Sequence, residues 1–352
     1  MTAGRRLPEE AYAAALASVP RVGPAALRRL LATDPPSVAW SGASLGRESD
    51  VARIWQSHEE LDIAVLTVDH PEYPQRLLGD PEAPAVLFCR GNPSVVNQCA
   101  TVALVGTRSP TRYGIGVAAQ FGADLAAVGI SVVSGLALGI DGAAHEGACG
   151  AGAPPVAVVA GGLDEPYPSR HARLWERVAG QGAVLSESPV GMPTEKWRFP
   201  VRNRLLAALS DVVVVVESRH HGGSLHTVNA AMDRGIPVGA VPGSIRSPTS
   251  EGTNALLADG AFPVCGPSDI LAALSLKGVA LPGPGPPVSG QDSEHPCPQA
   301  DRALFDALSP DPVSLDQLAR TTGLDLPALC GGLERLAQAG VARDVGVWWE
   351  RT

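Results

Sequence analysis

The sequence predicts an α/β protein built on a largely parallel sheet, and two features carry this prediction. Short apolar runs alternate along the chain with small-residue segments of helical periodicity, which is the pattern of strands joined by crossover helices. Glycine-rich turns follow many of these runs, as they do where parallel strands end. The runs that we expect to form about seven or eight strands buried on both faces are 63–68, 85–89, 102–105, 130–133, 156–160, 183–185, 212–216 and 237–241.

Composition limits the class of protein. The 352 residues are enough for one large domain with small additional ones. No apolar run is long enough to span a bilayer and no basic, apolar leader opens the chain, so we expect a cytoplasmic protein without membrane contact. The six cysteines include no Cys-x-x-Cys pair, which favours reduced thiols over disulfides or zinc. A net charge of −9 argues mildly against general nucleic-acid binding but does not exclude a local basic site.

The first part of the chain, from 7 to about 66, has a helical pattern of its own. Segments 9–19 and 25–31 carry alanine and leucine at helical spacing, and the prolines and glycine of 20–24 separate them. Two short helices around a glycine turn resemble a helix-hairpin-helix, which presents backbone N–H groups to a DNA phosphate. The signal is weak, because many plain helical hairpins also turn on Gly-Pro, so a plain hairpin is favoured and DNA contact is the alternative.

The turn after the run 102–105 is suited to a phosphate. Glycine turns and helix N-termini favour an anion, and Arg108 adds a full charge. An ordinary NAD site is disfavoured, because Gly114-x-Gly116-x-x-Ala119 begins about eight residues after the strand and no acid ends the next one. That next run ends instead in Ser134-Gly135. A P-loop motif is absent, and we expect no cofactor.

A second candidate anion site follows the run 212–216. Two glycines precede Ser224, which we place near a helix start, with Thr227 one turn later. The loop also contains three histidines, and Glu217 is the nearby carboxylate. These histidines lack the spacing of a helical metal pair, so a solvated loop is favoured over a metal site. They are His220, His221 and His226.

The most specific run is 196–204, which holds four cations, two aromatic residues and no acid. Aromatic residues make up only 4% of the chain. Cations for the phosphates and rings for the bases are what a single-stranded nucleic-acid site requires. The alternative is a surface loop that packs Phe199 into the core and turns its charges to water. The position of the run between glycine turns favours binding.

Taken together, these motifs resemble the DNA-processing protein A (DprA/Smf) family, and the resemblance covers essentially the whole chain. The motifs are Gly-Thr-Arg at 106–108, Tyr-Gly at 113–114, Ser-Gly-Leu-Ala at 134–137, Gly-Ile-Asp at 139–141, Ala-His at 144–145, Ser-Glu at 186–187, Phe-Pro-Val-Arg-Asn-Arg at 199–204, Gly-Ser-Leu at 223–225, Val-Pro-Gly at 241–243 and Gly-Thr-Asn at 252–254. Three positions depart from the family pattern: His226 replaces an aliphatic residue, Ser188 replaces an aromatic one, and Leu163 alters a glycine run. The departures leave the detailed shape of the groove open.

The resemblance implies an extended Rossmann-like protein that binds single-stranded DNA, forms a homodimer and helps to load a RecA-type recombinase during natural transformation. It also implies a SAM/helix-hairpin-helix-like domain at 1–66, the Rossmann-like domain at 67–276, a linker at 277–298 and a winged helix at 299–352. The DNA groove would be lined by Arg108, Lys196, Phe199, Arg202 and Asn203. Backbone N–H groups for phosphates would come from the turns Ser134-Gly135 and Gly223-Ser224.

The C-terminal part independently predicts a winged helix-turn-helix. The stretch 277–298 is rich in glycine, proline and serine, as linkers are. Beyond it lie three amphipathic segments, at 300–307, 315–321 and 326–338, and then an alternating hairpin at 341–349 around Gly346. The third segment has few cations, so strong major-groove reading is disfavoured and contact with a protein is at least as good an interpretation.

Enzymatic interpretations rest on Asp141 and His145, which lie four residues apart and would share a helix face as an acid–base pair. We favour the alternative, in which Asp141 caps the helix and His145 bonds to a neighbouring loop. Nucleoside-monophosphate hydrolases of the lysine-decarboxylase-like type use a Pro-Gly-Gly-x-Gly-Thr loop followed by Glu, and 222–227 lacks that Glu. The sequence therefore favours a non-enzymatic binding protein, with this hydrolase as the alternative. An adaptor that only recruits partners is a third possibility.

Overall fold

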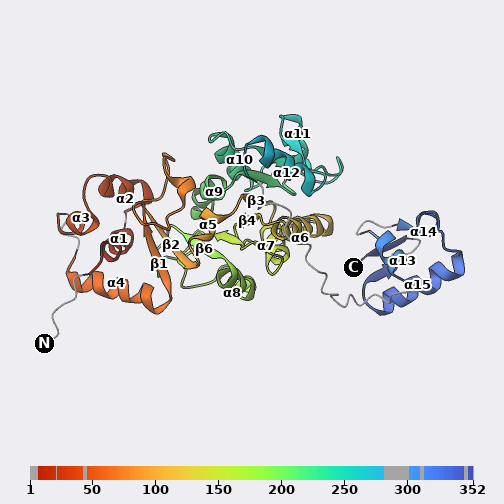
Figure 1. Ribbon diagram of the computed structural model, residues 1–352, viewed down its shortest axis with the longest axis horizontal. Coiled ribbons are helices and arrows are strands. Elements are labelled where there is room, and N and C mark those ends of the chain that lie inside the picture. Colours follow the sequence, from red (N-terminus) through yellow and green to blue (C-terminus); the bar gives the residue numbers. More distant parts are fainter. Residues whose placement is uncertain are drawn as a thin grey trace. The chain divides into compact units, whose positions relative to one another are not determined.

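The computed structural model describes residues 7–20, 22–42, 46–280, 301–309, 313–344 and 348–351. The chain divides into two compact units, Met1–Gly283 and Pro284–Thr352, each of which is described by itself (Figure 1). Most of the linker expected at 277–298 lies outside the described residues, which stop at 280 and resume at 301.

The first unit is built on a nine-stranded sheet with the order β1-β2-β6-β5-β4-β3-β7-β8-β9. All pairs from β6 to β9 are parallel, and β2 is antiparallel to both β1 and β6. The strands are β1 (Ile63–Thr67), β2 (Val86–Gly91), β3 (Thr101–Val105), β4 (Ser131–Ser134), β5 (Val156–Val158), β6 (Ala183–Ser186), β7 (Val212–Val215), β8 (Val238–Ala240) and β9 (Phe262–Pro263). The predicted α/β class is confirmed. The ninth strand was missed because two residues are too short to show a pattern.

The direction of winding changes between β3 and β7. From β3 the chain moves through β4 and β5 to β6 on one side, and it then returns to place β7 on the other side of β3. The loops that leave the carboxyl ends of β3 and β7 therefore diverge. In open α/β sheets ligands bind at such a switch point, so the topology by itself indicates where a site belongs.

Helices cover both faces of this sheet. On one face α6 (Arg112–Ala127), α7 (Ile140–Ala148) and α12 (Pro267–Leu276) pack over the valines of β3, β4 and β7. On the other face lie α9 (Arg198–Ala208) and α10 (Leu225–Met232) (Figure 1). The contact between α6 and α7 is close enough that a Cβ on Gly147 would lie 1.9 Å from the Ala119 carbonyl oxygen. Apart from the N-terminal helices, the other helical segments of the first unit are α5 (Val95–Gln98), α8 (Ala172–Gln181), α11 (Glu251–Ala258) and the short 3₁₀ turns Gln75–Leu77 and Ser169–His171.

The N-terminal helices share a core with the sheet. Leu16 of α1 is fully buried and belongs to the same hydrophobic cluster as Val65 of β1, Phe88 of β2 and Trp175 of α8. The four helices are α1 (Glu9–Ala17), α2 (Pro24–Leu31), α3 (Pro36–Gly42) and α4 (Glu48–Glu60). The boundary expected after residue 66 falls inside β1, whose strand pairs with β2. Apolar side chains on α1 fit the apolar face of the sheet edge, which explains why the helices pack there.

The second unit has its own core and is a winged helix, as predicted. Leu304, Leu318 and Leu333 are buried together, and a three-stranded antiparallel sheet has the order β10-β12-β11. Its elements are α13 (Arg302–Ala307), β10 (Val313–Ser314), α14 (Leu315–Thr322), α15 (Leu326–Gln338), β11 (Ala342–Asp344) and β12 (Trp348–Arg351). Gly346, around which the hairpin was expected to turn, lies outside the described residues.

None of the helices in the described residues has both the length and the apolar character needed to cross a bilayer.

Candidate nucleic-acid interface

A groove of about 470 Å³ lies at the carboxyl ends of β3 and β7, within the range of volumes that bind ligands. Its walls come from the loop after β3, the start of α9 and the loop between β7 and α10. Eight of the ten predicted site residues line it: Arg108, Lys196, Phe199, Arg202, Asn203, Gly223, Ser224 and Thr227. The predicted residues Ser134 and Gly135 are not among the lining residues.

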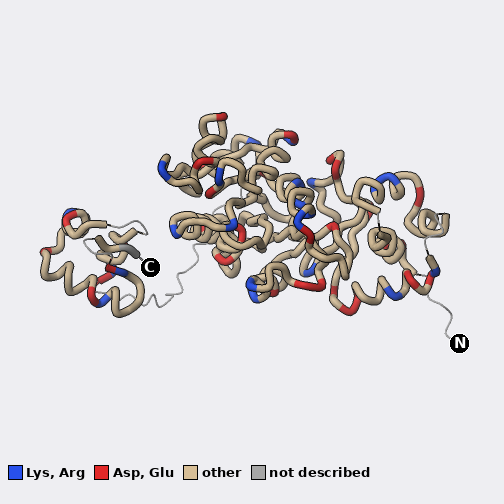
Figure 2. Tube along the Cα trace, turned by 180° about the vertical axis from the view of Figure 1, so that it is seen from behind, with Lys and Arg blue, Asp and Glu red and all other residues tan. Residues whose placement is uncertain are grey.

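The groove is locally cationic. Its described lining includes Arg108, Lys196, Arg202 and Arg219, against one acid, Asp141. Arg108, Lys196 and Arg219 are exposed and have no ion pair with any described residue. Elsewhere along the trace, basic and acidic residues are mixed (Figure 2). Because the chain as a whole is acidic, this excess of positive charge is a property of the groove. Sequence reasoning missed Arg219, which follows β7 without a motif of its own.

Arg202 lines the groove, and its buried side chain forms the floor. Its side chain is buried, its Nη1 donates to the carbonyl oxygens of Gly135 (3.0 Å) and Val158, and its Nε donates to Asn203 Oδ1 (3.1 Å). Burial lowers the pKa of the Arg202 guanidinium to about 10, which leaves it charged at neutral pH. Arg202 thus adds charge to the groove while most of its donors bind the protein.

The turn at Ser134-Gly135 is closed to a ligand, and the expectation that it serves a phosphate is corrected. The Ser134 hydroxyl is fully buried and donates to the Leu104 carbonyl oxygen (2.6 Å). The Gly135 N–H donates to Asp141 Oδ2 (3.1 Å). A Cβ on Gly135 would lie 2.5 Å from both Arg202 Nη2 and Asp141 Oδ2. Glycine is therefore needed here so that the buried carboxylate and guanidinium can approach the backbone.

The second turn, at Gly223-Ser224, has backbone N–H groups that are free to bind a ligand. The backbone N–H groups of both residues have no hydrogen bond with any described residue, whereas the next two amides bond within the turn. The Ser224 hydroxyl donates to Ser218 Oγ (2.9 Å), and Asn203 Nδ2 donates to the Gly223 carbonyl oxygen (3.1 Å), which ties α9 to the turn. Thr227 Oγ1 is buried without a described hydrogen-bond partner. Free amides just before α10 suit an anion.

An aromatic ring beside the cations faces the groove. The guanidinium carbon of Arg108 lies 4.2 Å from the centre of the Phe199 ring, and the Tyr167 ring lies 5.8 Å from Phe199 at an angle of 45°. Phe199 is half-buried, so part of its ring is open. Tyr167 was missed because its loop, after β5, reaches Phe199 only in the folded chain. The arrangement offers a flat apolar surface next to unpaired positive charge.

Glu217, at the end of β7, is hydrogen-bonded to the loop after β3. Its carboxylate accepts from the Thr111 N–H (2.8 Å) and the Thr111 hydroxyl (2.6 Å), and its carbonyl oxygen accepts from the Thr107 N–H (2.8 Å). The acid at the end of β7 therefore fastens the loop that carries Arg108. It does not neutralise the groove.

The geometry of Asp141 and His145 fits the structural interpretation better than an acid–base pair. His145 is fully buried, and its Nε2 lies 3.1 Å from the Val156 carbonyl oxygen. Burial lowers the pKa of His145 to about 4, so its ring is neutral at pH 7. Burial also raises the pKa of Asp141, which the charge of Arg202 opposes. Both side chains bond to backbone groups near the sheet; Asp141 receives the Gly135 N–H instead of capping its own helix.

The fold and the groove define a Rossmann-like protein whose switch point is shaped for an anionic ligand and whose chain continues into a winged helix. The chain belongs to the DNA recombination-mediator protein A family, whose model matches residues 64–275. The DprA winged helix domain matches residues 289–337. The family prediction is confirmed.

Individual relatives support this family membership. The chain is 34% identical over 232 residues to the DNA processing protein DprA of Bacillus subtilis, covering 66% of this chain and 78% of the relative. It is 35% identical over 282 residues to protein Smf of Escherichia coli, covering 78% and 74%. The solved structure of DNA processing protein A from Streptococcus pneumoniae has a TM-score of 0.62 at 30% identity, covering 76% of this chain and 93% of that one. The structure of DNA processing protein A from Helicobacter pylori, described for its unique single-stranded DNA binding mode, has a TM-score of 0.55 at 29% identity, covering 61% and 97%.

Proposed function

We propose that this protein binds single-stranded DNA in the groove between the β3 and β7 loops and acts, without catalysis, in the processing of incoming DNA during transformation. One observation carries the proposal: the described lining of the groove has four cations and one acid, in a chain with a net charge of −9. That acid, Asp141, lies buried beside Arg202, so it adds no free negative charge. The related Helicobacter pylori protein is described for its binding of single-stranded DNA.

The groove supplies the two contacts that a bare strand needs. Arg108, Lys196 and Arg219 meet the phosphates, together with the free amides of Gly223 and Ser224. Phe199 receives a base. Base stacking requires an unpaired face, which a duplex keeps inside its helix, so the ring favours single strands over duplex.

The partners and the organisation of the chain are part of the proposal. We propose that the protein helps to load a RecA-type recombinase and acts as a cytoplasmic homodimer; the description of its family as DNA recombination-mediator proteins supports the recombinase as a partner. We also propose the four-part organisation, with later boundaries near 276 and 298 and with the first boundary moved out of β1 (Ile63–Thr67), the strand that contains residue 66. In the winged helix, the Arg335 side chain of α15 donates to Asp301, and the exposed start of the helix is Leu326. These features support contact with a protein more than with phosphates.

A salt-titrated binding measurement tests the proposal. Oligothymidylate and a duplex of the same length are each titrated by fluorescence anisotropy at several salt concentrations. We expect tighter binding of the single strand and a logarithm of the affinity that falls linearly with the logarithm of the salt concentration. Equal affinity for the two nucleic acids, or binding that salt does not weaken, would contradict the proposal.

A further inference from the structure

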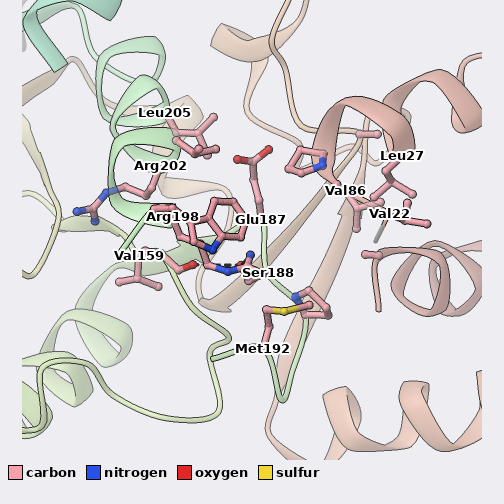
Figure 3. Close-up of a pocket in the computed structure, with 18 residues that line it drawn as sticks. Val22, Leu27, Val86, Val159, Glu187, Ser188, Met192, Arg198, Arg202 and Leu205 are labelled. Carbon is pink, nitrogen blue, oxygen red and sulfur yellow. Dashed lines mark hydrogen bonds between the residues drawn. The ribbon is translucent and has the colours of Figure 1, made fainter. Parts of the chain in front are cut away.

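A second pocket adjoins the groove on the other side of the first turn of α9. It lies between α9, the ends of β5 and β6, and the turn that leads into α2, where Val22 is labelled in Figure 3. Gly23 and Pro24, the first residue of α2, also line it. Arg202 lines both the pocket and the groove. The helix-hairpin-helix-like segment and the Rossmann-like part thus meet at this pocket. With a volume of about 80 Å³ it is too small for a whole nucleotide.

Trp197 stands at this pocket as an open aromatic surface. Its neighbours in sequence, Lys196 and Phe199, line the groove, but Trp197 lines the pocket. The residue is 55% exposed, and its Nε1 donates to Glu195 Oε2 (2.8 Å), which fixes the indole. The guanidinium carbon of Arg198 lies 4.5 Å from the ring centre. Arg198 and Trp197 thus make, at the start of α9, the same kind of arginine-over-ring contact that Arg108 and Phe199 make in the groove.

The acids at the pocket are paired within the protein, so they leave no uncompensated negative charge to repel a phosphate chain that passes over it. Arg198 Nη1 donates to Ser188 Oγ (3.1 Å), while its Nε is buried without a described hydrogen-bond partner. The acid of the pocket is Glu187, which is labelled in Figure 3. Its carboxylate pairs with Arg204. The nearby Glu195 lies 3.6 Å from Arg198 Nε and accepts from Trp197. Both acids are thus already paired with the protein.

We propose that Trp197 is a second base-stacking site, and that a single strand held in the groove continues over the first turn of α9 to place a further nucleobase on the indole, across the mouth of this pocket. The inference rests on the proposed function. The connecting phosphate passes the start of α9, where the side chain of Trp197 makes no capping hydrogen bond. Arg198 N–H already donates to the Glu195 carbonyl oxygen and Pro200 has no N–H, so the Phe199 N–H, which has no hydrogen bond with a described residue, is the amide left for that phosphate. The bases at the two sites stack on Phe199 and Trp197, which supply contacts without base specificity.

Binding of oligothymidylates of two lengths tests this path. One has about 4 nucleotides, enough for the groove, and the other about 16, enough for the extended path. We expect Trp197→Ala to weaken binding of the longer strand on the order of tenfold while the shorter strand binds as to the wild type. Trp197→Phe retains a ring and restores most of the loss. Tryptophan fluorescence is quenched by the longer strand in the wild type, and this quenching disappears in Trp197→Phe.

Trp348→Ala is the matched control, because Trp348 is also exposed (45%) but belongs to the second unit. If Trp197→Ala binds both lengths as the wild type does, the second site is refuted while the proposed function stands. An equal loss for both lengths also refutes it, because Trp197 then belongs to the groove itself. A wild-type protein that binds neither length refutes the proposed function instead.

Discussion

Arg108 lies over the ring of Phe199, with 4.2 Å between its guanidinium carbon and the ring centre, although 91 positions separate the two residues in the chain. Arg108 comes from the loop after β3 and Phe199 from the first turn of α9. The contact places a full positive charge and an apolar ring at one point of the groove. A phosphate and its own base can therefore be held by neighbouring side chains.

The exposed cations should control how salt affects binding. Replacing Arg108 or Lys196 with Ala should weaken binding of oligothymidylate of any length and flatten the salt dependence by about one unit of slope, because one phosphate contact is lost. Salt titrations of each variant measure this. Arg53→Ala is the control, since Arg53 is exposed on α4, away from the groove. Unchanged binding in both groove variants, with the fold intact by circular dichroism, would remove the groove as the site.

Phe199 should contribute stacking instead of charge. Phe199→Ala should cost about 1–3 kcal/mol of binding free energy with little change in the salt slope. Phe199→Tyr keeps the ring and serves as the control. A slope that changes as much as in Arg108→Ala would show that the ring acts by positioning the arginine, not by stacking on a base.

The buried pair beneath the groove should matter for stability. Asp141→Asn removes the carboxylate charge that accepts from the Gly135 N–H and acts on the buried Arg202 guanidinium, and the expected loss is about 1–3 kcal/mol in the free energy of unfolding. Urea denaturation of the two single variants, Asp141→Asn and Arg202→Met, and of the double variant gives their coupling. We expect the double variant to lose less than the sum of the singles. Strict additivity would mean that the two groups do not interact.

His145 should make the protein less stable in acid. The folded-state pKa of His145 is lowered to about 4 by burial, below its ordinary 6.5, so the unfolded chain takes up a proton first. The stabilisation is complete above about pH 6.5 and is lost as the pH falls towards 4, by about 2 kcal/mol between pH 7 and pH 5. His145→Gln should reduce that loss, and His220→Gln, at an exposed position, should not. Equal losses in the wild type and His145→Gln would contradict this account.

The hydrolase alternative is tested directly. We expect no free base when the protein is incubated with nucleoside monophosphates, because Asp141 and His145 are bound to backbone groups. Chromatography of the products measures release. Turnover that Asp141→Ala abolishes would overturn the non-enzymatic proposal.

Much of the fold could be predicted because strands and helices have local patterns. The apolar runs at 102–105 and 212–216 became β3 and β7, and the winged helix followed from three amphipathic segments and a hairpin. The two glycine turns could not be told apart in this way. Both combine serine with glycine after a buried strand, yet the first binds Asp141 and the second keeps its amides free. Whether the amides of such a turn stay free depends on whether folding brings a carboxylate to them, as it brings Asp141 to Gly135.

The sequence by itself determined the α/β class, the family and the residues from which a binding site could be made, since periodicity, glycine turns and a run of cations and rings are local properties. The tertiary structure decided which of those residues line the groove, which line the neighbouring pocket and which are buried. Helical rotation in α9 sends Phe199 to the groove and Trp197 to the neighbouring pocket, and burial makes Arg202 part of the floor. Arg219 and Tyr167 join the site because separate loops end at the same edge of the sheet. Contacts of this kind depend on distance in space, which neighbouring letters in a sequence do not record.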